Sequence, residues 1–299
     1  MNSYEARRII EALRSGVPSK AVGAFFSSSR PQTLKLFEDH IDKCANEGES
    51  SSFVFLGKYG EGKTHMLNTV FNMAHERNMV VSMISLSKET PLNNMVSLYQ
   101  KIISNIYLPD RQQPGFIADM DERMKDSAFY ADLLLYTSTN LNCNKLNYLL
   151  KAYKMVEDPD KRYLMQSDLC GNFMKMSDLK KFYKETYHEA LKPNETFAKT
   201  KHITDYFRFM SYLFEKMGYN GWVILFDEAE LIGRFAKKSR MKSYLNMAYF
   251  LLPEKQLHSL FSVFAFTESY VEEVIDSKAD YEILKELYPD QPEPKIGRA

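Results

Sequence analysis

A stretch of eight residues combines three glycines with a lysine and a threonine in a spacing that suits phosphate binding. It reads Gly57-Lys58-Tyr59-Gly60-Glu61-Gly62-Lys63-Thr64 and is followed by His65. Every fixed position of the pattern G-x-x-x-x-G-K-[ST] is present. Glycines let the chain turn tightly, so that successive backbone N–H groups point at one anion. We expect all nine residues to contact a nucleotide, with Lys63 at its terminal phosphates and the Thr64 hydroxyl on Mg²⁺.

Two carboxylates follow a second apolar run. Residues 223–226 are all apolar, and Asp227 and Glu228 come directly after them. A buried strand can carry carboxylates only at its exposed carboxyl end, which is the edge where open α/β sheets bind ligands. We expect Asp227 to hold Mg²⁺ through its water shell and Glu228 to activate an attacking water. Glu230 is the alternative catalytic carboxylate, and a plain acidic helix start is the alternative to a site.

A third polar strand end and a basic run lie near these carboxylates in the chain. Residues 261–266 form an apolar strand that ends at Thr267, which we expect beside the acidic strand as a catalytic sensor of the γ-phosphate. An ordinary strand-end hydroxyl is the alternative. The basic run holds Arg234, Lys237, Lys238, Arg240 and Lys242. A solvated helix face is the favoured interpretation of this run, and contact with nucleic acid or with a neighbour's nucleotide is the other.

The composition excludes several protein classes. The chain has 299 residues, of which 44% are hydrophobic, and its 39 Lys and Arg balance 39 Asp and Glu. This excludes a disordered chain and disfavours a strongly basic nucleic-acid coat protein. Three cysteines without close spacing form neither a disulfide framework nor a zinc site, and the six histidines show no metal spacing. With no signal-peptide or membrane-spanning run, we expect a soluble cytoplasmic protein.

The order of apolar patterns predicts an α/β protein with a parallel sheet. Short apolar runs predict strands at residues 53–56, 80–86, 222–226 and 260–266, with amphipathic helices between them. Apolar periodicity also predicts a helix at residues 6–13, a second that starts at Pro31, and a third that starts at Pro91 and includes Ile106. Helical periodicity without a strand marks residues 110–201 as a helical insertion, with helices at 129–136, 146–156 and 176–190. We therefore predict an N-terminal helical segment over 1–50, an ATPase-like core over 51–109 plus 202–290, and the insertion between the two parts of the core.

The two motifs and the order of elements resemble a P-loop ATPase of the additional-strand type, as in the AAA+ superfamily. Several local features narrow this resemblance: the segment from Arg7 to Pro18, the loop from Gly57 to His65, the long helical insertion and the run from Leu225 to Glu230. Together they resemble the BREX-type ATP-binding domain of BrxC and BrxD proteins, which belong to bacterial anti-phage defence systems. Relatives of that domain accompany Lhr-like helicases in other defence operons.

The resemblance implies ATP binding and Mg²⁺-dependent hydrolysis, coupled to DNA or to a helicase partner, in a protein without membrane contact. It also implies a homo-oligomer in which an arginine, Arg234 or Arg240, completes a neighbour's site. About 30 residues follow Thr267, so the helical lid usual in AAA+ proteins is expected to be reduced or missing. A non-hydrolysing ATP-dependent switch or adaptor is therefore the alternative function, and a small-molecule or nucleotide kinase is a third.

Overall fold

The computed structural model describes residues 31–109, 111–253 and 257–287. The helix expected at residues 6–13 and the Arg7 to Pro18 segment lie outside the described residues. The first described helix, α3 (Pro31–Glu47), begins at the proline from which a helix was predicted. Proline suits a first helical turn because its missing N–H would have no partner there.

A five-stranded sheet forms the centre of the fold, and its order is β1-β5-β4-β2-β3. The strands are β1 (Ser51–Gly57), β2 (Val80–Ser85), β3 (Ile106–Tyr107), β4 (Trp222–Asp227) and β5 (Leu260–Thr267). The first four in the order pair in parallel, and β3 adds an antiparallel edge beside β2. The predicted α/β class with a mainly parallel sheet is thus confirmed. Strand β5 lies beside the acidic strand β4, as expected, and its other neighbour is β1.

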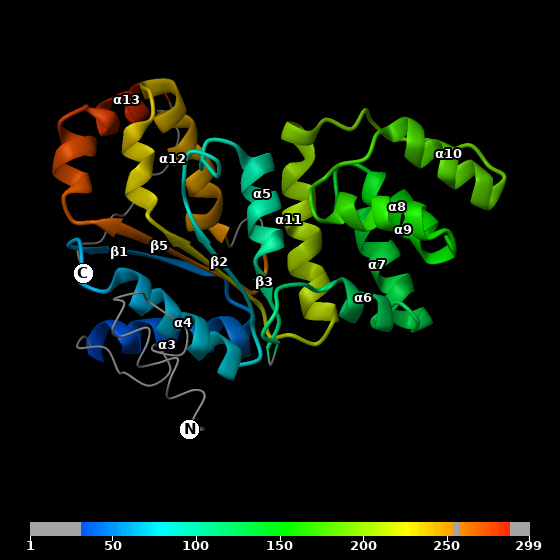
Figure 1. Cartoon of the computed structure of the whole chain (residues 1–299), viewed down its shortest axis with the longest axis horizontal. Coiled ribbons are helices and arrows are strands. Elements are labelled where there is room, and N and C mark those ends of the chain that lie inside the picture. The colour runs from blue at the N-terminus through cyan, green and yellow to red at the C-terminus, as the bar shows by residue number, and fades with distance from the viewer. Residues whose placement is uncertain (1–30, 110, 254–256, 288–299) are drawn as a thin grey trace.

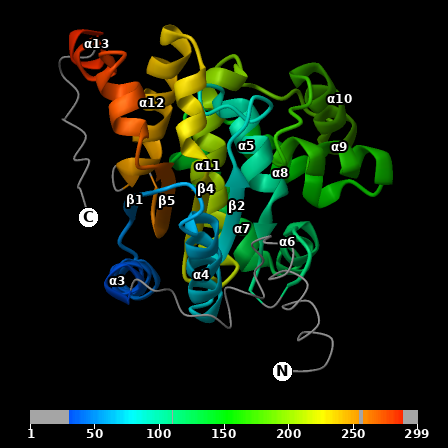
Figure 2. The ribbon, with the colours of Figure 1, turned by 60° about the vertical axis from the view of Figure 1, so that its left-hand side comes forward.

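The continuous apolar runs are explained by helices on both faces of this sheet. Along β4, Val223 and Leu225 pack into one hydrophobic cluster with α3 and α4 (Lys63–Glu76), whereas Ile224 and Phe226 pack into the other. On that second side lie α5 (Met95–Ser104), α11 (Lys199–Lys216) and α12 (Lys237–Leu251) (Figure 1). Figure 2 shows α3 and α4 below the sheet and α12 above it. Successive residues point to opposite faces, so a strand covered on both faces needs no polar alternation.

Two short segments differ from the sequence-based prediction. The helix expected from Pro91 begins at Met95, because the side chain of Asn94 caps it by accepting bonds from the N–H groups of Val96 and Ser97. Ile106, expected on that helix, lies instead in the two-residue strand β3. The helical spacing of apolar residues includes Ile106, although the helix ends at Ser104 and Ile106 pairs with β2. Periodicity alone therefore could not locate the C-terminal end of α5.

In its described part, the segment between β3 and α11 has helices as its only regular elements, and Figure 1 shows it as a lobe on the far side of α11 from the sheet. Its helices are α6 (Ile117–Arg123), α7 (Ser127–Thr139), α8 (Lys145–Met155), α9 (Pro159–Leu169) and α10 (Met176–Tyr187). Helices at the positions of α7, α8 and α10 were predicted, whereas α6 and α9 were not. The boundaries proposed between core and insertion stay predictions.

A buried ion pair joins α8 to α9 inside this lobe, and a hydrogen bond from α11 ends on it. Lys145 Nζ lies 2.5 Å from Asp168 Oδ2, and the two side chains are 1% and 0% exposed. Asp168 also accepts hydrogen bonds from the Tyr206 hydroxyl at 2.6 Å and from the Met174 N–H at 2.8 Å. The Lys145 ammonium lies 4.0 Å from the centre of the Phe197 ring. Burial lowers the pKa of Lys145, and the Asp168 carboxylate opposes that shift.

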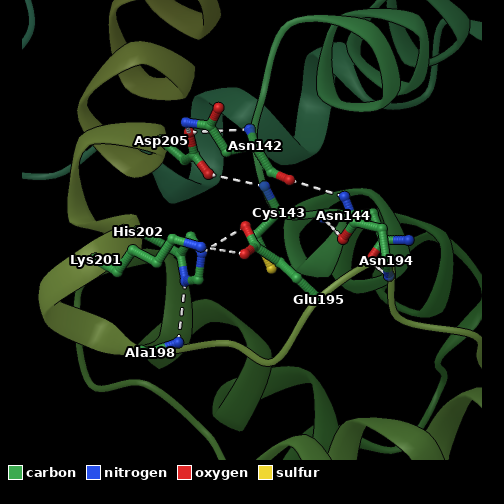
Figure 3. A network of polar contacts seen from close by, with 9 residues as sticks. All are labelled: Asn142, Cys143, Asn144, Asn194, Glu195, Ala198, Lys201, His202 and Asp205. Carbon is green, nitrogen blue, oxygen red and sulfur yellow. Dashed lines mark hydrogen bonds and ion pairs between the residues drawn. The ribbon is translucent and has the colours of Figure 1, made fainter.

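A second polar network ties the turn before α8 to α11 (Figure 3). The buried carboxylate of Asp205 accepts bonds from the backbone N–H and the amide of Asn142 and from the N–H of Cys143. One turn earlier, His202 Nε2 lies 2.7 Å from Glu195 Oε1 while its Nδ1 accepts the Ala198 N–H. Both ring nitrogens of this histidine are therefore occupied by structural contacts, and the lobe is held to α11 by specific polar contacts as well as by apolar packing.

Candidate functional site

Four strand ends meet at the carboxyl edge of the sheet. Gly57 ends β1 and is paired in register with Thr267, which ends β5. Ser85 ends β2 and is paired with Asp227, which ends β4. The phosphate loop, the acidic pair and Thr267 come from three separate segments of the sequence. Parallel pairing brings them together at the carboxyl edge of the sheet. The serine was not among the residues singled out in the sequence.

The phosphate loop leads from β1 directly into the N-terminus of α4. Gly60 and Gly62 have φ angles of +83° and +84°, which only glycine adopts without strain, and no atom lies within 4 Å of a Cβ built on Gly60. Lys63 is the first residue of α4, so the unpaired N–H groups and partial positive charge of that helix start face the loop. The backbone here has the conformation that an anion-binding loop requires.

The side chains of the loop divide into two groups. Lys58, Tyr59 and Glu61 are exposed, and Tyr59 reaches 96% exposure. Lys63 is half-buried and curls back over the loop, where its Nζ donates to the carbonyls of Gly57 at 3.2 Å and Lys58 at 3.3 Å. Both acceptors are neutral backbone carbonyls, so these bonds do not pair the ammonium with a carboxylate. The Glu61 carboxylate accepts the Lys58 N–H at 2.8 Å, and the Glu61 N–H donates to the Lys58 carbonyl at 3.2 Å, so these two residues are bonded to each other within the loop.

A short hydrogen bond joins the loop to the acidic strand. The Thr64 hydroxyl donates to Asp227 Oδ2 at 2.6 Å, and Asp227 is only 6% exposed. A hydroxyl and a carboxylate are the hard oxygen ligands that Mg²⁺ takes when phosphates and waters supply the rest of its shell. Among the described residues, no group of three or more His, Cys, Asp or Glu side chains is placed to hold a metal by itself.

Glu228 stands next to this pair in a strained backbone conformation. Its φ is 55° and its ψ 37°, a left-handed geometry that costs a non-glycine residue roughly 1–2 kcal/mol. Its N–H donates to Asp227 Oδ1 at 2.9 Å, and its exposed carboxylate accepts the Ser85 hydroxyl at 2.9 Å. The strain turns the carboxylate along the sheet edge toward β2. Ser85 could have been found as the polar residue that ends a buried apolar strand.

Glu230 contributes a third carboxylate in the short helical turn η1 (Ala229–Arg234). Its Oε2 atom is buried and makes no hydrogen bond within the described part of the chain. Burial raises the pKa of Glu230, the Lys63 charge lowers it, and the charges of Asp227 and Glu228 raise it. A buried carboxylate oxygen without a hydrogen bond costs stability, so this atom is suited to accept a hydrogen bond from a bound ligand.

Thr267 lies between the two motifs because β5 pairs with β1 on one side and β4 on the other. It is half-buried, and the N–H of the next residue, Glu268, donates to the Gly57 carbonyl at 3.2 Å. The predicted position beside the acidic strand is therefore confirmed, whereas the role of Thr267 as a sensor stays a prediction.

The structure contradicts the expectation that Arg240 offers a free guanidinium to a neighbouring subunit. Arg240 is 6% exposed and forms a two-pronged ion pair with Asp280, at 2.8 Å from Nε and 2.6 Å from Nη2. Its Nη1 donates to the Phe235 carbonyl at 2.9 Å. This pair joins α12 to α13 (Asp280–Leu287), which both views show beside it. The acidic partner lies 40 residues away in the chain, so no nearby residue indicated this ion pair.

The residues of this edge have the chemistry that a magnesium nucleotide would need. There is open space at Gly60, Lys63 brings its amino group to the loop, and Thr64 and Asp227 each present an oxygen of the kind that Mg²⁺ binds. Within the described residues, the buried Oε2 of Glu230 is an acceptor without a donor. A Cβ added at Gly57 would approach Lys63 Cγ to 3.2 Å, so the loop accepts no larger residue there without moving its lysine.

Comparison with known proteins agrees with this site. The family model described as BREX system ATP-binding protein BrxC/D matches residues 1–124 and 194–284, which together are more than two thirds of the chain. The matched segments contain the loop, Asp227, Glu228 and Thr267, while the unmatched residues 125–193 contain α7 to α10. No curated protein and no solved structure matches the chain. In the described ranges, no helix is both long and apolar enough to cross a bilayer.

Proposed function

The chain belongs to the BREX system ATP-binding protein BrxC/D family, and we propose that it binds ATP with Mg²⁺ and hydrolyses it, with nucleotide state coupled to DNA or to a helicase partner. The observation that carries this proposal is the 2.6 Å hydrogen bond from Thr64 to Asp227, two residues 163 positions apart in the chain. It joins a phosphate-binding loop to a metal-binding carboxylate at one sheet edge. Phosphate-transferring P-loop sites need that combination.

The loop binds and orients the nucleotide. Backbone N–H groups at the start of α4 donate to the phosphates, and Lys63 leaves its carbonyl partners to reach the terminal one. Thr64 and Asp227 would hold Mg²⁺, which would neutralise charge on the phosphates. Because Thr64 and Asp227 already lie together, little rearrangement is needed to form this site, and that preorganisation favours catalysis.

Glu228 is the base in this proposal. Its carboxylate accepts a proton from the water whose oxygen attacks the terminal phosphorus, while the bond from that phosphorus to the bridging oxygen breaks. In the structure one oxygen of Glu228 is engaged by the Ser85 hydroxyl, so Ser85 holds the carboxylate along the sheet edge. Release of that bond frees Glu228 to turn toward a water, which makes Ser85 a positioning residue.

Two lysine variants test nucleotide binding. Lys63→Ala removes a charge-assisted contact to phosphate worth about 1.5–3 kcal/mol, which corresponds to roughly 10- to 150-fold weaker binding of a fluorescent ATP analogue. Lys180→Ala removes the same charge from an exposed side chain of α10, outside the proposed site, and serves as the control. If Lys63→Ala is folded and binds the analogue as tightly as the wild type or the control, the site assignment is wrong.

We also propose that the protein acts in the cytoplasm, where ATP is available and thiols stay reduced. Cys44 and Cys143 are buried, and all three cysteines are free. Burial raises the pKa of Cys44 to about 12 and that of Cys170 to about 11, which makes both poor nucleophiles. Unpaired and unreactive cysteines are typical of cytoplasmic proteins.

A further inference from the structure

Two basic side chains line a surface pocket at the same edge of the sheet as the proposed nucleotide site, and two more lie on α12, the helix that follows the pocket wall in the chain. We call them the basic surface; they are Lys88, Arg234, Lys238 and Lys242, and all four are exposed. The pocket has a volume of about 250 Å³ and is lined by Ser87, Lys88, Glu89, Leu231, Arg234 and Phe235. The proposed function uses none of these residues.

Two loops that follow neighbouring strands form the pocket. Residues 87–89 come directly after β2, and η1 with Phe235 comes directly after β4, the strand paired with β2. The pocket therefore opens at the sheet edge on the β2 side of Glu228, whereas the phosphate loop lies on the β1 side. Ser85, which bonds Glu228, lies two residues before the pocket wall begins.

The orientation of α12 brings two lysines to this loop. Asn246 donates from its amide to the Leu92 carbonyl at 2.8 Å, so the Asn246 side of α12 faces the segment between β2 and α5 (Figure 1). Lys242 and Lys238 precede Asn246 by four and eight residues, and residues four apart share a helix face. Four residues correspond to about 40° around the helix and eight to about 80°, so Lys242 shares the Asn246 side of α12 and Lys238 lies at its border.

The charge of this region is one-sided. Residues 231–253 contain five basic side chains and no Asp or Glu, and the buried Arg240 is the member neutralised by Asp280. Within the described ranges, the four cations of the basic surface form no ion pair. The pocket wall contains one carboxylate, Glu89, which accepts the Ser87 hydroxyl at 3.0 Å, and Glu228 lies nearby in its bond with Ser85. Four exposed cations thus outnumber the two carboxylates at or near the pocket, Glu89 and Glu228, and this excess of positive charge favours a polyanion.

We propose that the basic surface binds the phosphate backbone of a single nucleic-acid strand and that one base enters the pocket. A row of cations along η1 and α12 suits regularly spaced phosphates. Walls made by Leu231, Phe235 and the Arg234 guanidinium suit the flat face of a base, since aromatic rings and guanidinium groups both stack on bases. A membrane surface or an acidic protein segment would use the cations but not the pocket.

Strand binding at the basic surface adds to the proposed function, and only the coupling of strand binding to ATP hydrolysis rests on that function. Strand binding needs no nucleotide, because none of the pocket residues belongs to the phosphate loop. Coupling would pass through the short segment from Ser85 to Ser87, which bonds Glu228 at one end and lines the pocket at the other. A bound strand would shift residue 87 and thereby change how Ser85 holds Glu228.

The experiment measures fluorescence anisotropy of a labelled oligothymidine of about 30 nucleotides from about 50 to 200 mM salt without nucleotide. The test protein is Arg234→Ala/Lys238→Ala/Lys242→Ala. Its control is Lys180→Ala/Lys181→Ala/Lys184→Ala, which removes three exposed lysines from α10, outside the matched family segments. Each phosphate contact contributes about −0.7 to the slope of log affinity against log salt, so the test protein should lose about 2 from the slope and the control almost nothing.

A second pair of variants tests the pocket. Phe235→Ala should weaken oligothymidine binding roughly fivefold or more through lost stacking, and Phe235→Tyr, which keeps the ring, should restore it. All variants should bind a fluorescent ATP analogue like the wild type, so failure of the nucleotide site would appear separately. Unchanged strand binding by the test protein, or an equal loss in the α10 control, would overturn the proposal. So would a test protein that binds the strand normally and loses only concentration-dependent ATP hydrolysis, because the surface would then face a neighbouring copy's nucleotide.

Discussion

The buried ion pair between Lys145 and Asp168 allows a sharp prediction about how the helical lobe is held. Asp168→Ala leaves the Lys145 ammonium buried without a counter-charge, and it also removes the acceptor of the Tyr206 hydroxyl and the Met174 N–H. Removing one member of a buried pair costs about 3–5 kcal/mol. The Tyr206 hydroxyl and the Met174 N–H also lose their acceptor, which adds to the cost of the unpaired charge. We therefore expect the free energy of unfolding to fall by about 4 kcal/mol or more.

Urea unfolding followed by the single tryptophan measures this loss. Trp222 is fully buried at the start of β4 and packs against Phe207 and Phe214 of α11, so its emission reports on contact between the sheet and α11. With a slope of about 3 kcal/mol per molar urea, the midpoint should fall by more than about 1 M.

Two comparison variants sharpen this test. Asp178→Ala, an exposed carboxylate on α10, should change the midpoint little. Lys145→Met/Asp168→Leu should recover much of the loss, because no buried charge remains. The account of the pair would be refuted if Asp168→Ala cost less than about 1 kcal/mol, or if the double variant were as unstable as the single one.

Three further predictions concern the nucleotide edge. Glu228→Gln should keep ATP binding and lose turnover by roughly 10²-fold or more in a steady-state phosphate-release assay; if Glu230→Gln abolishes turnover and Glu228→Gln does not, the base is Glu230. Thr64→Ala should raise the Mg²⁺ concentration needed for half-maximal hydrolysis, and an unchanged Mg²⁺ dependence would exclude its hydroxyl as a ligand. Arg240→Ala should lower the melting temperature, since it leaves Asp280 buried without its cation, and a variant as stable as the wild type would contradict that role.

The parts of the fold that could be predicted are those encoded within a few residues. The loop from Gly57 to Thr64 contains its own glycines, lysine and hydroxyl, and the apolar run before it and the helix after it are continuous in sequence. The strand before Asp227 is equally local, since burial on both faces requires an unbroken apolar run. Parallel pairing then determines which ends meet, so the neighbouring positions of these motifs followed from the chain alone.

The parts that could not be predicted depend on pairs far apart in the chain. Ser85 and Glu228 are 143 residues apart, and Arg240 and Asp280 are 40 apart, so nothing in the spacing indicated either contact. Helix α9 was missed for a different reason: it has little apolar periodicity, although Asp158 caps it and Pro159 opens it, a start signal that was available. The basic run is a further example. Its five cations look alike in the sequence, but in the structure Arg240 is buried in an ion pair and the other four are exposed.

Helix α11 connects the unmatched lobe to the nucleotide edge. On one side its Asp205 and Tyr206 bond the turn before α8 and the buried pair of the lobe. On the other, Phe207 and Phe214 pack on Trp222, the first residue of the strand that ends in Asp227. A close-packed helix transmits displacement because its contacts cannot be compressed. The lobe is therefore attached to the strand that carries the acidic pair through buried contacts, rather than through a loop that could absorb its motion.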